Sequence, residues 1–211
     1  MPPFAKSPIG SAIAIAIWIG VSGCAEEHDR PSGLPVRQTS AALDKPIRLL
    51  DLDGQPFDLW RGGQDKITVV VFTRSDCPIS NRYAPEIRQL YESFHPRGVE
   101  FYLVYVDPHE PPDAIRTHLQ EYQYPCIALR DPEHTLVAAT GATVTPEAAV
   151  FAADHKLAYH GRIDDRNSDF GKSAPEAAKH DLADAIEATL AGQPVQEPVT
   201  KAVGCYIGDL D

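Results

Sequence analysis

Residues 67–78 read Ile-Thr-Val-Val-Val-Phe-Thr-Arg-Ser-Asp-Cys-Pro, an apolar run that ends in a short polar stretch and a cysteine. An unbroken apolar and β-branched run such as 67–72 is typical of a strand buried on both faces of a sheet. Helical spacing follows, at positions i, i+3, i+4 and i+7: Ile87, Leu90, Tyr91 and Phe94. The pattern predicts that Cys77 lies where a central strand passes into the start of a helix.

Cys77 is the candidate reactive thiol of this chain. Pro78 suits the first position of a helix, because the N–H group it lacks would have no helical partner there. Free N–H groups and the positive end of the helix dipole stabilise a thiolate and lower its pKa. Arg74 and Arg82 would strengthen this effect, and Asp76 would oppose it. The alternative is a buried packing cysteine, but the position at a helix start favours the reactive thiol.

The remaining apolar runs alternate between strands and helices. Strands are predicted at 47–52, 67–72 and 99–106, with a hairpin formed by 148–152 and 156–159. Helices are predicted at about 84–95, at 112–122 and at 175–190. The short run 126–129 fits either a strand edge or a loop. This order predicts an α/β domain with a mixed central sheet flanked by helices.

The N-terminal residues predict export and anchoring. Lys6 precedes an apolar core at 13–21, which is shorter than the roughly 20 residues that a membrane-spanning helix needs. Residues 21–24, Val-Ser-Gly-Cys, resemble a bacterial lipobox, and this resemblance implies cleavage before Cys24 and lipidation of its thiol. The alternative is an ordinary secretory signal in which Cys24 is incidental.

Four segments follow from these patterns. We predict a signal peptide at 1–23, a flexible polar tether at 24–42, the folded domain at 43–191 and a tail at 192–211 that carries Cys205. The formal net charge of −11 argues against nucleic acid as a partner. The expected location is the cell envelope, on a membrane and facing the periplasm or the exterior. Once Cys24 is lipidated, the three thiols left are Cys77, Cys126 and Cys205. Three is an odd number, so at least one thiol should be free, reactive or metal-bound.

Three local features resemble the redoxin group of thioredoxin-fold proteins, which includes the TlpA-like thiol-disulfide proteins and the AhpC/TSA peroxiredoxins. Cys77 matches the strand-to-helix cysteine of that fold, and Pro85 stands eight residues later. Thr145-Pro146 matches the cis-proline loop, which is informative because a cis bond is a minority state even before proline. A plain trans turn at Pro146 is the alternative.

The resemblance covers roughly residues 43–191 and implies a thioredoxin-like three-layer fold. It also implies that Thr145 and Pro146, with Pro78, form the substrate-binding surface beside the active cysteine. In that group the cis-proline loop packs against the cysteine and offers backbone groups to an incoming substrate.

The chain lacks part of the motif of each subfamily of that group. Ser80 replaces the second thiol of Cys-x-x-Cys, so resolution within that motif is excluded. Arg74 stands where a peroxiredoxin has threonine, and Thr73 is one residue farther from Cys77. Asn81 replaces the second cysteine of the Sco-type copper chaperones, and the initiator is the only methionine, so no thioether ligand for copper exists.

The tail offers a thiol in place of the missing one. Cys205 lies in an apolar patch, and Gly204 before it would allow close backbone approach. One hypothesis is that the tail docks near Cys77, where Cys205 serves as the resolving thiol or as a second metal ligand. The other is that Cys205 is a packing residue or pairs with Cys126, because spacing does not fix connectivity. Cys126 itself is interpreted as a small, buried hydrophobic residue.

We therefore predict a membrane-anchored thiol-disulfide oxidoreductase. The Cys77 thiolate would attack a protein or small-molecule disulfide, or a peroxide, and Cys205 or else Cys126 would resolve the product. Arg74 would stabilise the thiolate or orient the substrate, and an external thiol would reduce the protein. No cofactor is expected. The alternatives are a peroxiredoxin-like peroxidase, a Sco-like carrier that holds copper through Cys77 and Cys205, and an interaction module.

Two further groups of polar residues are interpreted as surface features. The histidines are scattered without metal-binding spacing, and most are predicted at the surface: His109, His118, His134, His155, His160 and His180. The mixed charge run at 162–166 is interpreted as a solvated loop, in which ion pairs contribute little.

Overall fold

The computed structural model describes residues 47–61, 66–169 and 171–208. The predicted signal peptide, Cys24 and the tether lie outside these residues. Chain contacts place the described residues in one compact unit, so the described part of the predicted tail belongs to the same unit as the domain. Among the described residues, no helix is long and apolar enough to cross a membrane.

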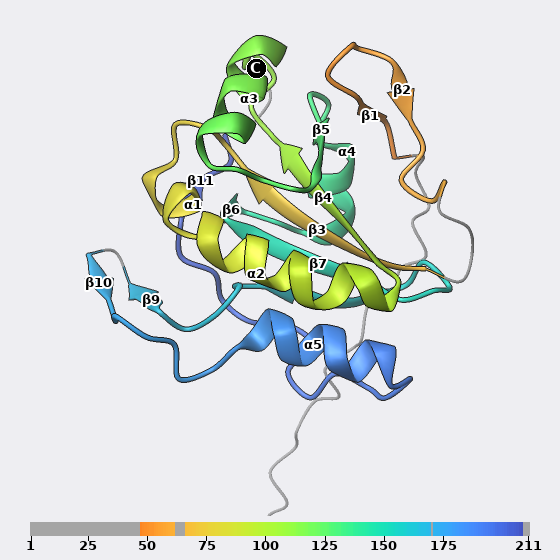
Figure 1. Cartoon of the computed structure of the whole chain (residues 1–211), viewed down its shortest axis with the longest axis vertical. Helices are drawn as coiled ribbons and strands as arrows, with labels where there is room; N and C mark the ends of the chain where they lie inside the picture. The colour runs from red at the N-terminus through yellow and green to blue at the C-terminus, as the bar shows by residue number, and fades with distance from the viewer. Residues whose placement is uncertain (1–46, 62–65, 170, 209–211) are drawn as a thin grey trace, which may run out of the picture. The chain divides into compact units, whose positions relative to one another are not determined.

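A mixed seven-stranded sheet forms the centre of this unit, with the order β2-β1-β5-β4-β3-β7-β8 (Figure 1). Its strands are β1 (Leu49–Leu50), β2 (Pro56–Phe57), β3 (Ile67–Thr73), β4 (Val99–Tyr105), β5 (Ile127–Arg130), β7 (Glu147–Phe151) and β8 (Leu157–Gly161). β3, β4 and β5 run parallel, and β7 pairs antiparallel with β3. The predicted α/β class with a mixed sheet is confirmed.

Helices cover both faces of the sheet. They are α1 (Pro78–Arg82), α2 (Ala84–Phe94), α3 (Pro112–Glu121), α4 (Thr135–Thr140) and α5 (Asp181–Leu190), with a 3-10 turn at His95–Arg97. Alternate residues of a strand point to opposite faces. Val69 and Val71 of β3 therefore pack with α2, α3 and α5, whereas Val70 and Phe72 pack with α4. Figure 1 shows α2 and α5 side by side on one face.

The structure differs from the predicted elements at three places. The run 126–129 is part of an interior strand, because β5 lies between β4 and β1 and is not an edge or a loop. The last helix begins at Asp181, not at 175, because Asp165 accepts the N–H groups of Ala178 and Lys179 and holds that segment as a loop. The first strand is shortened to Leu49–Leu50.

Helix α4 was not predicted, because its six residues are too few to display a helical period. A side-chain cap starts it. The buried carboxylate of Asp131 accepts the backbone N–H groups of Thr135, Leu136 and Val137 at 2.8–2.9 Å. These are N–H groups that have no partner within a helix, so the aspartate satisfies them.

Two short strand pairs lie outside the central sheet. β9 (Asn167–Asp169) pairs with β10 (Lys172–Ser173). β6 (Val144–Thr145) pairs antiparallel with β11 (Cys205–Tyr206), which comes from the tail. The second pair joins two segments far apart in the chain, and Figure 1 shows both strands close to α1, where the Cys77 segment begins its helix.

Candidate thiol site

The Cys77 thiol lies at the junction of β3 and α1, where the sequence places it. Cys77 is the N-cap of α1, with an extended backbone (φ −86°, ψ 107°), and Pro78 occupies the first turn. The Ser80 N–H points to the Cys77 sulfur at 3.5 Å. The residue is only 1% exposed, and its sulfur contacts Ser80 of α1, Thr145 of β6 and Cys205 of the tail. The thiol therefore meets helix N–H groups in a nearly closed setting.

The nearest partner of Cys77 is the tail cysteine. The sulfurs of Cys77 and Cys205 are 2.8 Å apart, and the Cys77 sulfur also lies 3.1 Å from the backbone oxygen of Thr145. Both cysteines are free. A disulfide has an S–S length of about 2.05 Å, so an approach of less than about 1 Å would join the two sulfurs. This geometry agrees with the hypothesis that the tail docks beside Cys77.

Hydrogen bonds give the two sulfurs opposite acidities. Burial would raise the pKa of Cys77, but donors from Cys205, Ser80 and Thr145 outweigh it and lower the pKa to about 7. The hydroxyls of Ser80 and Thr145 are buried and have no other hydrogen-bond partner in the described structure. Burial and the neighbouring Cys77 raise the pKa of Cys205 to about 11. At pH 7 about half of Cys77 is therefore ionised, while Cys205 keeps its proton and can donate it to the Cys77 thiolate.

Backbone pairing with β6 places Cys205 at the site. Cys205 is opposite Thr145 and Tyr206 is opposite Val144, and the Ile207 N–H donates to the Thr143 oxygen at 3.0 Å. Gly204 makes this approach possible. A Cβ atom at that position would lie 2.1 Å from the Thr145 oxygen and 2.6 Å from its carbonyl carbon. Glycine is therefore required here by close approach of two backbones.

A second anchor lies five residues before Cys205, where the tail crosses β8. The Thr200 N–H donates to the His160 oxygen, and the His160 N–H donates to the Pro198 oxygen. The Thr200 hydroxyl lies 2.6 Å from the Tyr159 hydroxyl and accepts the Arg162 N–H. Gly161 permits this crossing, since its Cβ would lie 2.3 Å from the Thr200 hydroxyl. The tail thus covers the edge of β8 before it reaches Cys77.

The other predicted substrate-binding residues surround the sulfur pair. The Thr145–Pro146 bond is cis, as the resemblance implied, and both residues are buried. Pro78 is exposed beside the buried Cys77. Whether these residues bind a substrate stays a prediction.

Arg74 contacts two carboxylates, and its role at the thiolate or the substrate stays a prediction. Its guanidinium contacts Asp76 at 2.8 Å and Asp107 at 3.7 Å. Its charge opposes the rise in the pKa of Cys205, and it is not among the groups that lower the pKa of Cys77. The two carboxylates thus hold the guanidinium where its charge acts on the tail thiol.

Cys126 lies apart from the sulfur pair. It is free, 7% exposed and packed in the hydrophobic cluster beneath α2, and burial raises its pKa to about 12. The alternative pairing of Cys126 with Cys205 is not present, because Cys205 contacts Cys77. Cys126 has the properties of a packing residue.

A buried polar relay, which the sequence did not reveal, supports the Cys77 loop. The Tyr105 hydroxyl lies 2.7 Å from His118 Nδ1, and His118 Nε2 lies 2.8 Å from the Asn81 side-chain oxygen. The Asn81 amide then donates to the Ser75 backbone oxygen, two residues before Cys77. Burial lowers the pKa of His118, which is 3% exposed. The predicted surface position of this histidine is therefore wrong.

The charge run at 162–166 is also not a solvated loop. Asp164 is 1% exposed, accepts the Tyr83 hydroxyl at 2.6 Å and binds the Arg166 guanidinium at 2.6 Å. Tyr83 joins α1 to α2, so this network fixes the helix pair that follows Cys77. A sequence pattern does not show this, because the partners are about 80 residues apart.

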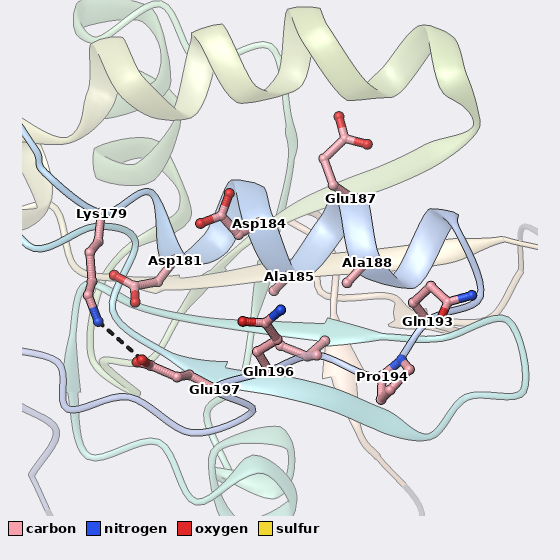
Figure 2. A pocket seen from close by; sticks show the side chains of 11 residues that line it. Lys179, Asp181, Asp184, Ala185, Glu187, Ala188, Gln193, Pro194, Gln196 and Glu197 are labelled. Atoms are coloured by element: carbon pink, nitrogen blue, oxygen red, sulfur yellow. Dashed lines mark hydrogen bonds and ion pairs between the residues drawn. The ribbon is translucent and has the colours of Figure 1, made fainter.

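The structure also has a hollow away from the thiols. Figure 2 shows it between α5 and residues 193–197, with a volume of about 560 Å³. Asp181, Asp184 and Glu187 line it from the helix, and a Lys179–Glu197 ion pair of 3.1 Å closes one end. No cysteine lines it. Among the described residues, no three His, Cys, Asp or Glu side chains group as metal ligands.

Comparison with known proteins agrees with this architecture. The model of the AhpC/TSA family matches residues 41–160. An uncharacterized conserved protein from Geobacillus kaustophilus is similar, with a TM-score of 0.66, 27% identity and coverage of 79% of this chain and 89% of that one. A hypothetical protein from Sinorhizobium meliloti 1021 has a TM-score of 0.65, 24% identity and coverage of 76% and 88%. No curated protein matches the chain at a significant level.

A thiol:disulfide interchange protein of the thioredoxin family from Chlorobium tepidum TLS has a TM-score of 0.50 and 16% identity, and the match covers 69% of this chain and 96% of that one. At this identity the likeness concerns the fold alone. The thioredoxin-like fold that the resemblance implied is confirmed.

Proposed function

Because the chain belongs to the AhpC/TSA family and has two free thiols in contact, we propose that it is a thiol-disulfide oxidoreductase with Cys77 as nucleophile and Cys205 as resolving thiol. The observation that supports this is the pair of sulfurs 2.8 Å apart with a pKa of about 7 for one and about 11 for the other. The thiolate is the nucleophile in disulfide exchange, and a pKa near ambient pH is the optimum for attack.

The reaction has two steps. The Cys77 thiolate attacks one sulfur of a substrate disulfide, forms a mixed disulfide and releases the other sulfur as a thiolate, which takes a proton from water. Cys205 then loses its proton and attacks the Cys77 sulfur, which releases the second substrate thiol and leaves a Cys77–Cys205 disulfide. The substrate gains two electrons and the protein loses two, so an external thiol reductant must restore the dithiol.

Disulfide mapping tests the proposal. Reduced protein is mixed with a small excess of a low-molecular-weight disulfide and analysed by peptide mass spectrometry. We expect a reversible Cys77–Cys205 bond, and in Cys205→Ser a persistent mixed disulfide on Cys77. Cys126→Ala is the matched control and should behave as wild type. A Cys126–Cys205 bond, or release of the mixed disulfide at the wild-type rate in Cys205→Ser, would refute the assignment.

The first alternative is a peroxidase, which the resemblance to the AhpC/TSA peroxiredoxins implies. One observation favours it: the Thr73 hydroxyl is buried at the end of β3 without a hydrogen-bond partner in the described structure. The assay is peroxide consumption by the reduced protein. Consumption that is fast compared with disulfide exchange, and lost in Cys77→Ser, would favour the peroxidase.

The second alternative is a redox-dependent copper carrier that uses Cys77 and Cys205. The two adjacent thiols are soft ligands that suit Cu(I). A copper stoichiometry near one in the reduced protein, lost in Cys77→Ser, would favour the carrier. An enzyme that needs no cofactor should instead exchange disulfides when metal-free.

We also propose that the chain is a lipoprotein of the cell envelope, anchored through Cys24. The support is the apolar core at 13–21 followed by small residues and a cysteine. The mature N-terminal peptide should begin at Cys24 and carry acyl chains by mass spectrometry, and Cys24→Ser should leave the membrane fraction. Equal membrane association of Cys24→Ser and wild type would contradict the anchor.

A further inference from the structure

The tail sits on β6 as an extended strand whose cysteine meets the candidate nucleophile. Cys205 is opposite Thr145 in the antiparallel pair, and its sulfur contacts that of Cys77. A cysteine-containing polypeptide in exchange with Cys77 would need the same three features, namely an extended backbone, pairing with β6 and a sulfur at Cys77.

We propose that tail residues 204–207 are a built-in competitor for the β6 edge, and that the register of this edge selects, among extended polypeptide disulfides, those with glycine before the reacting cysteine. The inference rests on the proposed function and adds to it the substrate class and the order of events.

Competition follows from the burial of Cys77. The sulfur is enclosed while the tail is docked, since Cys77 is 1% exposed and the β6 backbone groups are already paired with β11. A substrate strand and the tail would therefore need the same hydrogen-bonding positions at Val144 and Thr145. One must leave before the other binds.

The tail is held in a way that permits release. Thr200 is firmly anchored by its bonds to Tyr159, His160 and Arg162. Beyond that point, the described bonds that hold the tail are the two-residue pairing of β11, the Ile207 N–H bond and the contact between the sulfurs. The Tyr206 side chain is 74% exposed and buries little apolar surface, so the apolar contact of this segment comes from the partly buried Ile207, which packs against a core cluster. Residues after Thr200 can detach without breaking the anchor, as a local opening of low cost.

The glycine requirement comes from the register. A side chain at the Gly204 position would place its Cβ 2.1 Å from the Thr145 oxygen. A substrate strand that binds in the register of the tail meets the same oxygen one residue before its cysteine. Any residue other than glycine there would force the strand away from β6, and backbone hydrogen bonds would be lost.

This arrangement couples resolution to product release. When the tail returns, it takes back the β6 positions that held the substrate strand. Attack by Cys205 on the Cys77 sulfur then breaks the remaining covalent link, so the product leaves as a thiol. The electron balance is that of the proposed function, with the polypeptide disulfide reduced and the Cys77–Cys205 disulfide formed.

The test uses two synthetic peptides as probes. One has the sequence of residues 202–207, Ala-Val-Gly-Cys-Tyr-Ile, and its twin has alanine in place of glycine. Each carries a mixed disulfide to 5-thio-2-nitrobenzoate, whose coloured thiolate leaves readily because its pKa is low. A cysteamine mixed disulfide of the same leaving group serves as the small probe. The full chain is used as wild type, Gly204→Ala and Gly208→Ala.

We expect wild type to react about tenfold faster with the glycine peptide than with the alanine peptide, which corresponds to about 1.4 kcal/mol. Gly204→Ala should undock the tail, which also removes the Cys205 donor, so the rates are compared at pH 9.5, where Cys77 is largely ionised with or without it. The rate with the glycine peptide should rise by about tenfold or more, beyond the roughly three- to eightfold that loss of the donor alone would give. Gly208→Ala is the matched control, because a Cβ there has nothing within 4 Å, and it should behave as wild type.

Equal rates for the two peptides with wild type would overturn the inference, and this comparison needs no variant to fold. Equal rates for Gly204→Ala and Gly208→Ala would overturn the competition. The small probe distinguishes failure of this inference from failure of the proposed function. If it is reduced while the peptides are not distinguished, only the inference fails; if it is not reduced, the proposed function fails with it.

Discussion

Removal of the Cys205 thiol should raise the pKa of Cys77 by an amount that the structure allows us to work out. Cys205 is the strongest of the donors that lower this pKa from 9.0 to about 7. A hydrogen bond to a charged group contributes about 1.5–3 kcal/mol, which is about one to two pKa units. Cys205→Ala should therefore titrate at a pKa of about 8–9. Cys205→Ser keeps an O–H donor and should stay near 7.

The reactivity of Cys77 should then change in a pH-dependent way. At pH 7 the thiolate fraction should fall from about one half to between about 1% and 9%. A more basic thiolate is intrinsically more nucleophilic, by about three- to eightfold for this shift. The net alkylation rate at pH 7 should fall by about two- to sixfold, and above pH 9.5 the alanine variant should react about three- to eightfold faster than wild type.

The assay is thiolate absorbance against pH, combined with alkylation rates over the same range. Cys126→Ala should be present in every variant, so that one titrating thiol is removed from the background. The reasoning fails if Cys205→Ala and Cys205→Ser have the same Cys77 pKa within a few tenths of a unit. It also fails if the serine variant titrates near 9, since the hydroxyl would then not replace the thiol as donor.

Three other predictions concern the surroundings of the site. Burial lowers the pKa of His118, so the unfolded chain binds a proton at this residue before the folded chain does as the pH falls, and stability is lost below the ordinary value of 6.5. The unfolding free energy of His118→Gln should therefore fall less between pH 7 and 5 than that of wild type. A parallel decline of the two proteins would contradict this. Tyr83→Phe removes a donor to the buried Asp164 and should cost about 1–3 kcal/mol in urea denaturation, whereas no loss would mean that Arg166 alone satisfies the carboxylate. Cys126, with a pKa of about 12, should resist alkylation at pH 8 in the folded protein and react only after denaturation; labelling at the rate of a free thiol would show that the core opens there.

Much of the fold follows from local patterns. The run 67–72 is apolar on both faces because β3 has neighbours on both sides and helices on both faces. Pro78 and Cys77 mark the helix start, since capping and proline preferences act within one turn. Elements shorter than two helical turns, such as the six-residue α4, have too few positions to show such a pattern, and the isolated run at 126–129 could not be distinguished from an edge.

The acidities of the sulfurs could be predicted only in part. A lowered pKa for Cys77 follows from its place at a helix start, but the donor with the largest effect comes from the tail. The effect of Arg74 depends on which carboxylates reach it, and Asp107 lies 33 positions away in the chain. Long-range partners of this kind are set by side-chain packing, which no spacing rule contains.

The sequence by itself determined the α/β order of elements, the start of α1 at Cys77 and the turn chemistry at Pro146. These depend on neighbours within a few residues, where backbone sterics and periodicity act. Only the tertiary structure decided that Cys205 meets Cys77 and Cys126 does not. It also decided that His118 and Asp164 are buried in polar networks. Each of these depends on contacts between segments distant in the chain, such as β6 with β11, whose free energy exists only once the chain has folded.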